Sequence, residues 1–306
     1  MQNSHDPLYE PLSTPLLETD GETLLASISY WKDGVRRLKA NPLAICALCI
    51  LALLVLMALI GPSLTPYSYY ETHLSLKNRP PSSAFWFGTD ELGRDLFTRI
   101  WWGARISLFV GIAASFIDLV IGVLYGSLAG LLKGRSEEAM MRLADILSSL
   151  PYLLAVILLM VVIGPGLASI ILALTLTGWI PMARIVRGQI LSLREQDFVK
   201  AAAALGAGRF RLLFHHLIPN CMGPILVTLT LTIPSAIFAE AFLSFLGLGV
   251  QAPIASWGTM ANDGLSAMRY YPWRLFLPAG FISLTMLSFN LLGDALRDAF
   301  DPKLRS

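Results

Sequence analysis

The sequence predicts an all-α integral membrane protein with six transmembrane helices. The first reason is its composition: of 306 residues, 55% are hydrophobic and only 14% are charged, against about a quarter charged in an ordinary soluble domain. The second reason is that the apolar residues form long runs without charge. In a bilayer only helices or closed β-barrels satisfy the backbone, and continuous rather than alternating apolar runs favour helices.

Six apolar runs are long enough to cross the hydrocarbon core of a bilayer, which is roughly 30 Å thick. They lie near residues 43–60, 106–132, 139–163, 167–184, 221–247 and 275–293. The third and fourth runs belong to one long uncharged stretch, which we divide at Gly164, Pro165 and Gly166 because these residues favour a tight turn. The first run follows a polar segment and has no small-residue cleavage pattern, so we expect a retained anchor rather than a secretory signal.

The runs divide the chain into five regions. We expect a cytoplasmic tail with an amphipathic interfacial helix at 1–41, the first transmembrane helix at 42–61 and an extracytoplasmic loop at 62–105. A helical core follows at 106–295, with a cytoplasmic loop at 185–220, and the cytoplasmic C-terminal tail is 296–306. The interfacial helix either positions the first span or contacts a partner, and its apolar residues recur at helical spacing: Leu24, Ile28, Trp31, Val35 and Leu38.

The distribution of positive charge predicts the orientation. If the N-terminus is inside, fifteen of the 23 Lys and Arg residues fall in cytoplasmic segments and seven on the other side. Lys and Arg accumulate in cytoplasmic loops, so both termini are predicted to be cytoplasmic. The net charge of +2 gives no reason to expect a nucleic-acid partner. The three cysteines lie in or beside apolar runs without metal-ligand spacing, so we expect reduced packing residues and no metal.

Two polar segments between the spans have distinct patterns. In the outer loop, Thr89 or Asp90 is expected to cap a short helix. A metal at the nearby acids is disfavoured because their spacing matches no calcium loop and Arg94 lies among them. In the 185–220 loop, four alanines favour a slender helix that ends near Gly206, and Pro219 is expected to end a second helical piece.

This loop resembles that of the membrane subunits of ATP-binding-cassette (ABC) importers, which carry Glu-Ala-Ala, three residues, Gly, nine residues and then an apolar stretch ending in Pro. Ala201, Ala202, Gly206 and Pro219 keep that register, whereas Lys200 stands where the family usually has Glu. Other stretches resemble the C-type permease of the dipeptide and oligopeptide branch. They include 31–44, 87–111, 243–249 with Trp257 and Gly258, and 289–302.

The resemblance implies a type I ABC importer permease in the bacterial inner (plasma) membrane, with 106–295 as its core. Its implied partners are a homologous second permease, two ABC ATPase subunits, an extracytoplasmic substrate-binding protein and membrane lipid. The sequence has no Gly-x-x-x-x-Gly-Lys-Ser/Thr loop, so ATP and Mg are expected on the ATPases and no cofactor on this chain. The residues expected to couple it to an ATPase are Phe198, Lys200, Ala201, Ala202, Leu205, Gly206, Ala207 and Pro219.

We expect the helix at 198–206 to lie in a groove of the ATPase and to move with it as one body. Gly206→Pro or Gly206→Glu is then expected to uncouple ATP hydrolysis from uptake while the protein still inserts. The Lys200 departure affects any salt bridge that the usual acid makes, but not the docking itself.

Glycines and carboxylates inside the spans are the other candidate functional residues. Gly122, Gly126 and Gly130 recur every four residues, which clears one helix face for packing within the chain or against the second permease. Asp118 lies on the same face, and Glu240 lies in the fifth span. A carboxylate at mid-membrane costs about 2.5–3.5 kcal/mol, so each is expected to line a translocation path, contact a peptide amine or hold helices together.

At the start of the third span, Arg142 and Asp145, three residues apart, are expected to pair with each other.

Two other classes of membrane protein remain as alternatives. A secondary transporter would also have six spans but would not need the Ala-Ala, Gly and Pro spacing. An intramembrane enzyme would need a nucleophile or metal set, and the sequence has no such catalytic motif. The resemblance leaves the substrate open among dipeptides, longer peptides, glutathione, nickel complexes and antimicrobial peptides.

Overall fold

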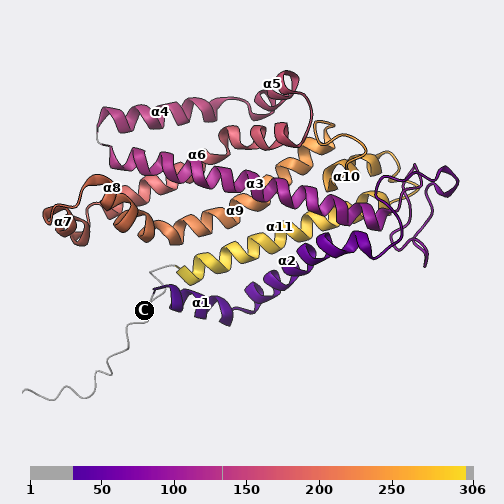
Figure 1. The fold of residues 1–306 in the computed structure, drawn as a ribbon, viewed down its shortest axis with the longest axis horizontal. Coiled ribbons are helices and arrows are strands. Elements are labelled where there is room, and N and C mark those ends of the chain that lie inside the picture. Colours follow the sequence, from indigo (N-terminus) through magenta and orange to yellow (C-terminus); the bar gives the residue numbers. More distant parts are fainter. Residues whose placement is uncertain (1–29, 133, 301–306) are drawn as a thin grey trace, which may run out of the picture.

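The structure is a computed structural model that describes residues 30–132 and 134–300, and every regular element in these ranges is helical. The long helices run along the longest axis of the molecule (Figure 1). Their bounds are α1 Tyr30–Ala40, α2 Pro42–Ile60, α3 Leu96–Leu131, α4 Arg135–Ser149, α5 Tyr152–Ile163, α6 Leu167–Leu193, α7 Asp197–Ala204, α8 Arg209–Arg211, α9 Ile218–Phe245, α10 Trp257–Leu265 and α11 Trp273–Phe300. Short elements are η2 Gly61–Ser63, η3 Leu74–Leu76 and the π-helical η4 Leu212–Leu217.

Five helical stretches within the described ranges are long and apolar enough to cross a membrane. They are Pro42–Ser63, Leu96–Leu131, Leu167–Leu193, Arg209–Phe245 and Trp273–Phe300. They overlap the predicted first, second, fourth, fifth and sixth spans, although α3 ends at Leu131 and α9 at Phe245, just before the predicted ends at 132 and 247. The helices extend past several predicted ends, and α3 begins at Leu96 rather than near Ile106 because the Asp95 carboxylate caps it, accepting a 2.8 Å hydrogen bond from the Thr98 N–H.

The predicted third span is not one continuous helix. Residues 139–163 fall in α4 and α5, whose axes are bent by 82° at a short break. Pro151 lies in this break and lacks the N–H that an unbroken helix needs, so the prediction of one helix over 139–163 is wrong. The pair can form a sixth span only as a broken one.

Ion pairs tie α4 to α6 rather than closing within α4. Arg184 Nη2 lies 2.7 Å from Asp145 Oδ1, and Arg187 Nη2 lies 2.6 Å from Glu137 Oε1. Arg142 instead pairs with Glu138 at 3.0 Å, one helical turn away. The predicted Arg142–Asp145 pair is therefore wrong, because the cationic side of α6 attracts Asp145.

The α3 and α6 helices form the most extensive helix pair of the described chain. A Cβ atom at Gly122 would lie 2.6 Å from Met182 Cβ, and one at Gly130 would lie 2.8 Å from Ile190 Cγ2. At Gly126 it would collide with the Ala183 carbonyl oxygen. The three glycines thus lie against α6 of the same chain, where their missing side chains let the backbones approach.

A hydrophobic core separate from the α3–α6 contact joins α2, α3, α10 and α11. Trp257 of α10 is fully buried there, and its Nε1–H donates a 3.0 Å hydrogen bond to the Ile100 carbonyl of α3. The Ser256 hydroxyl caps α10 and completes a capping box with Thr259. Rigid anchoring of α10 follows from these contacts.

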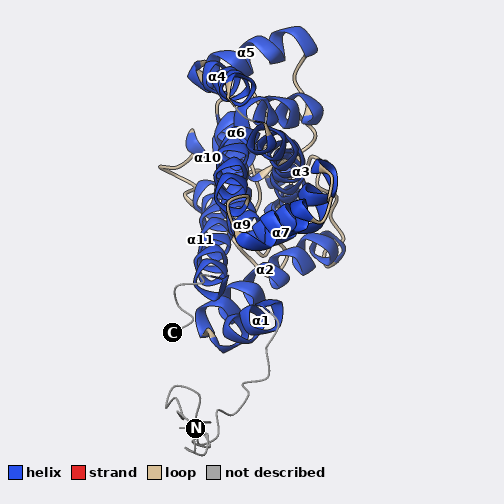
Figure 2. Cartoon of the chain, turned by 90° about the vertical axis from the view of Figure 1, so that its left-hand side faces the viewer, coloured by secondary structure: helices blue, strands red, loops and turns tan. Residues whose placement is uncertain are grey.

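The two ends of the bundle differ in what they carry. The elements α1, α7 and the C-terminal end of α11 lie at one end, whereas α10 and the 61–95 loop lie at the other (Figure 1). Figure 2 views the first end and places α1 and α4 at opposite edges of the bundle. At this end α1 contacts α11, with Gly34 against the Phe300 ring. Leu24 and Ile28 of the predicted interfacial helix and residues 301–306 of the predicted tail lie outside the described residues.

Candidate functional site

The short helix α7 is shaped by its two ends. Asp197 places a carboxylate in the first turn, where the helix dipole favours negative charge. At the other end, Gly206 has a φ of +88° and its N–H donates to the Ala203 carbonyl at 3.0 Å, while the Ala207 N–H donates to the Ala202 carbonyl at 3.1 Å. These two bonds form a Schellman motif, which stops the helix beside Gly206.

One side of α7 is anchored and another is open. Val199 is 5% exposed and packs in a cluster with Leu213, Leu217 and Ile190. In contrast, Phe198 is 42% exposed and Leu205 is 89% exposed. Apolar side chains gathered on an exposed face indicate a surface for a partner.

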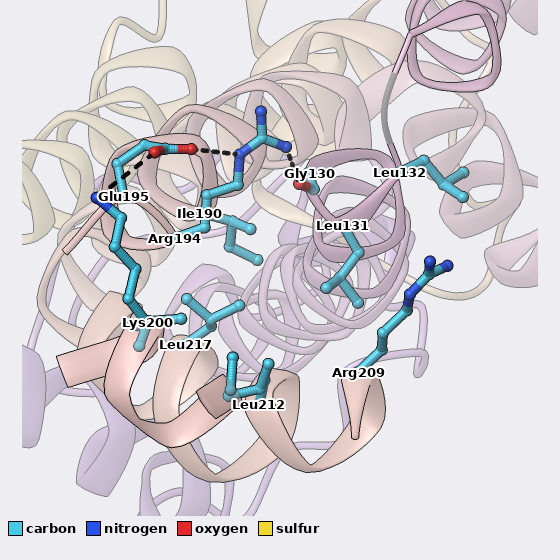
Figure 3. Close-up of a pocket in the computed structure, with 12 residues that line it drawn as sticks. Gly130, Leu131, Leu132, Ile190, Arg194, Glu195, Lys200, Arg209, Leu212 and Leu217 are labelled. Atoms are coloured by element: carbon cyan, nitrogen blue, oxygen red, sulfur yellow. Dashed lines mark hydrogen bonds and ion pairs between the residues drawn. The ribbon is translucent and has the colours of Figure 1, made fainter. Parts of the chain in front are cut away.

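A cavity of about 540 Å³ lies beside α7, between the ends of α3 and α6 and the start of the α8–η4 segment (Figure 3). Its apolar lining includes Leu131, Ile190, Leu212 and Leu217. Three cations also line it: Arg194, Lys200 and Arg209. The only acid among its lining residues is Glu195, so the described walls of the cavity favour an anionic group.

Glu195 is shared by two of these cations. Its Oε2 lies 3.9 Å from Lys200 Nζ and its Oε1 lies 3.5 Å from Arg194 Nε, as Figure 3 shows. Arg194 Nη1 also donates to the Gly130 carbonyl at 3.1 Å, which joins the ends of α6 and α3. The Lys200 side chain is 58% exposed, and such exposed pairs contribute little to stability. Its charge therefore remains available to a partner.

The other predicted loop residues lie on α7 or follow it in the chain. Ala201 is exposed and Ala202 is half-buried on α7, and Ala207 is half-buried just beyond it. Pro219 lies in the first turn of α9, which continues directly from η4. The expectation that Pro219 ends a helix is wrong, because the helical path runs through it. The Ile218 N–H, just before the proline, donates to the Leu213 carbonyl in the π-helical pattern of η4, and α9 continues to Phe245.

The two membrane carboxylates have separate surroundings. Asp118 is 5% exposed and its Oδ2 lies against Gly178 of α6, where no side chain would fit, while its Oδ1 has no hydrogen bond among the described residues. Glu240 is fully buried and accepts 2.8 Å hydrogen bonds from the Ser107 and Ser244 hydroxyls. The Ser107 hydroxyl in turn accepts from the Trp257 N–H at 3.2 Å, so Glu240 links α3, α9 and α10.

The α10 end holds a network of ion pairs that was not predicted from the sequence. Arg94 Nε lies 2.6 Å from Asp90 Oδ2, and Arg274 Nη2 lies 3.1 Å from Glu91 Oε2. The predicted cap at Thr89 or Asp90 is wrong, because Asp90 Oδ1 accepts from the backbone N–H of Arg94 and the helix begins after Asp95. The four-residue spacing of Asp90 and Arg94 was the available signal for this pair.

Burial raises the pKa of Asp95, although hydrogen bonds from Thr98 to its carboxylate oppose the shift. Its Oδ2 accepts from the Thr98 N–H and hydroxyl, and its Oδ1 has no hydrogen bond among the described residues. Asp95 therefore has two roles: it caps α3, and it is a titratable group whose pKa is raised by its burial.

Comparisons with known proteins agree with this architecture. Residues 122–306 match the family described as binding-protein-dependent transport system inner membrane component. Residues 29–81 match the N-terminal TM domain of oligopeptide transport permease C. In fold, the chain resembles the MetNI methionine ABC transporter in an inward facing conformation, with a TM-score of 0.52, 17% identity and coverage of 65% of this chain and 94% of that one.

Two relatives from Bacillus subtilis cover nearly the whole chain. The oligopeptide transport system permease protein OppC is 57% identical over 305 residues, which is 100% of both chains. The dipeptide transport system permease protein DppC is 60% identical over 280 residues, covering 91% of this chain and 88% of the relative. The resemblance expected from the sequence motifs is thus confirmed, and the chain belongs to the binding-protein-dependent transport system inner membrane components, in the branch of oligopeptide and dipeptide permeases.

Proposed function

We propose that the chain is one permease subunit of an ATP-driven importer of short peptides in the bacterial inner membrane. It pairs with a homologous second permease, and the two chains form the translocation pathway. A substrate-binding protein delivers the peptide at the α10 end, which is extracytoplasmic, while both termini and α7 are cytoplasmic. The names of the oligopeptide and dipeptide relatives support the peptide class.

Two ABC ATPase subunits drive the cycle and hold ATP and Mg. The single observation that carries this assignment is α7 itself, a helix fixed by buried Val199 and presenting Leu205 and Phe198 to the outside. Because one side of α7 is packed against the rest of the chain and the other side is exposed and apolar, a movement of the bound ATPase is transmitted through α7 without deforming it. The movement passes to α6 and η4, because their side chains pack in the same cluster as Val199.

The cationic cavity beside α7 gives the contact a charge preference. Lys200, Arg194 and Arg209 favour an acidic group on the docking ATPase. Lys200 reaches only Glu195 of its own chain, at 3.9 Å, so a partner's acid competes with a weak pair. Because Lys200 stands where the family usually has Glu, we expect the ATPase of this transporter to place an acidic residue opposite Lys200.

The membrane carboxylates take different roles in this proposal. Glu240 is a structural link, because Ser107 and Ser244 satisfy both of its oxygens and it has no exposed surface. Asp118 is the better candidate for the translocation path, because one of its oxygens lacks a partner within the described chain. Its contact with substrate stays a prediction.

Co-purification tests the docking surface. A tagged wild-type chain, expressed with the second permease and the ATPases, is expected to retain the ATPases, whereas Leu205→Asp is expected to lose them because a charge replaces the apolar contact. Leu265→Asp is the matched control, since Leu265 is also exposed, at 48%, but lies on α10 at the other end. Equal retention of the ATPases by Leu205→Asp and by wild type would contradict the proposal.

A further inference from the structure

A second pocket lies at the α10 end of the molecule, which is the end opposite α7 (Figure 1). It encloses about 290 Å³ between the segment before α3, the linker after α9, and α10 itself. This volume is at the lower end of the range for ligand pockets, so it fits one end of a peptide rather than a whole peptide. The polar residues that line it are Glu91, Arg94, Arg99, Ser244, Gln251, Thr259, Asn262 and Asp263.

Arg99 is the most deeply buried charge in this wall, with 3% of its surface exposed. Its Nη1 donates to the Tyr69 carbonyl at 3.1 Å, and its Nε lies 3.4 Å from Asp90 Oδ2. Its Nη2 has only the Asp263 carboxylate nearby, at 3.9 Å, which is too long for a hydrogen bond. Within the described chain, the Arg99 guanidinium thus has N–H donors at Nη2 that make no hydrogen bond and are free to bind a group that enters the pocket.

The neighbouring cations are better paired than Arg99. Arg94 has its 2.6 Å contact with Asp90, and Arg274 donates to Glu91 and to the Asp263 carbonyl, each at 3.1 Å. The Asp263 side chain is 42% exposed and faces Arg99 only across the 3.9 Å gap. Burial raises the pKa of Asp263, and Arg99 and Arg94 oppose this shift. Arg99 and Asp263 therefore form a loose pair that an incoming group can separate.

We propose that this pocket is a subsite for the α-carboxylate of a peptide, held by Arg99 with the amide groups of Gln251 and Asn262 beside it. The inference rests on the proposed function, because it names the part of the peptide that the permease recognises. A carboxylate suits a guanidinium because its two oxygens match the planar N–H fork. The Arg99 and Arg94 side chains are only 4% and 8% exposed, so a slender chain end reaches them and a broad protein surface does not.

Protection of a cysteine reporter tests the subsite directly. Gln251→Cys places a thiol on an exposed position of the pocket lining. The complete transporter is reconstituted in proteoliposomes without ATP and labelled with a membrane-impermeant maleimide. The dipeptide Ala-Ala is expected to slow labelling several-fold, whereas Ala-Ala amide, which lacks the carboxylate, is expected to leave the rate unchanged. Reactions of the native cysteines are subtracted using the chain without the reporter.

Charge variants distinguish a carboxylate subsite from general crowding. Arg99→Gln is expected to abolish protection by Ala-Ala. Because Arg99 is buried in a network, Asn262→Glu provides a second variant at an exposed position: its own carboxylate competes for Arg99, so protection weakens. Ser266→Glu adds the same charge at the end of α10 outside the pocket and is expected to retain full protection.

Several results would overturn the proposal. These are equal protection by Ala-Ala and its amide, no protection by either, or protection by the peptide-free binding protein while Ala-Ala gives none. The last result would assign the pocket to a protein contact. Peptide uptake is measured on the same vesicles after ATP is added. Normal uptake without protection refutes the subsite alone, whereas protection without any uptake counts against the proposed function instead.

Discussion

Gly206 ends α7 in a backbone conformation that residues with a side chain rarely adopt. Its φ is +88°, and a Cβ atom there would meet nothing within 4 Å. The requirement for glycine is therefore conformational and not steric. Because Leu205 immediately precedes it, the direction of the exposed Leu205 side chain depends on this turn.

We predict that Gly206→Ala reduces ATP-driven uptake while membrane insertion stays normal. A left-handed alanine costs about 1–2 kcal/mol, which unwinds the end of α7 and misdirects Leu205. Gly208→Ala is the matched control, because Gly208 has an ordinary φ of −67° and also has open space around it. Equal uptake by the two variants in proteoliposomes would show that the turn is unimportant.

Asp95 gives a prediction for pH dependence. Since burial raises its pKa, the folded protein binds the proton more readily than the unfolded chain. Its contribution to the free energy of unfolding is complete below the ordinary value of 3.8 and is lost as pH rises through the folded-state pKa. Asp95→Asn is therefore expected to reduce the fall in melting temperature with rising pH. Parallel melting curves for wild type and variant across this range would contradict the assignment.

Local spacing predicted some residues well and others poorly. The alanines and Gly206 indicated the helix and turn of α7, because helix propensity and glycine conformation act over a few neighbours. The partners of Arg142 and Asp145 were mispredicted, because the Asp145 partner, Arg184, lies 39 residues away on another helix. Likewise Arg99 meets Asp263 only after α3 and α10 pack together.

At the scale of elements, the α3–α6 contact depends on glycines that permit close approach. Gly126 lies directly against the Ala183 backbone, whereas Gly188 of α6 is exposed with nothing within 4 Å of its Cβ position. The same substitution at these two sites is therefore expected to have opposite effects.

We predict that Gly126→Ala lowers the melting temperature in detergent and that Gly188→Ala raises it. The first substitution forces two backbones apart, and overpacking of this kind costs about 1–3 kcal/mol. The second improves helix propensity by about 1 kcal/mol. Melting curves of the two purified variants and wild type provide the check, and a stable Gly126→Ala protein would contradict the close packing.

The bend between α4 and α5 shows why one span was mispredicted. Hydropathy along 139–163 is continuous, and an apolar run carries no information about the direction of its axis. Pro151 was the local signal for a break. The ion pairs that hold α4 on α6 could not be predicted from that signal, because they depend on the rotation of both helices.

At the scale of the whole molecule, the two ends carry different chemistry. The α7 end presents exposed apolar side chains beside a cationic cavity, and the α10 end holds a charged network around a small polar pocket. The apolar runs predicted the helical class and most spans, since burial in lipid dominates their energetics. The placement of α7 and α10 at opposite ends follows from the packing of α3, α6 and α9 along one axis (Figure 1).

The central claim is that this chain works as a peptide permease driven by separate ATPase subunits. The most direct test is uptake of a labelled peptide into proteoliposomes that contain the two permeases, with binding protein and ATP on the appropriate sides, in the presence or absence of the ATPases. We predict accumulation against a gradient only when the ATPases are present. Accumulation by the permeases alone would contradict the account.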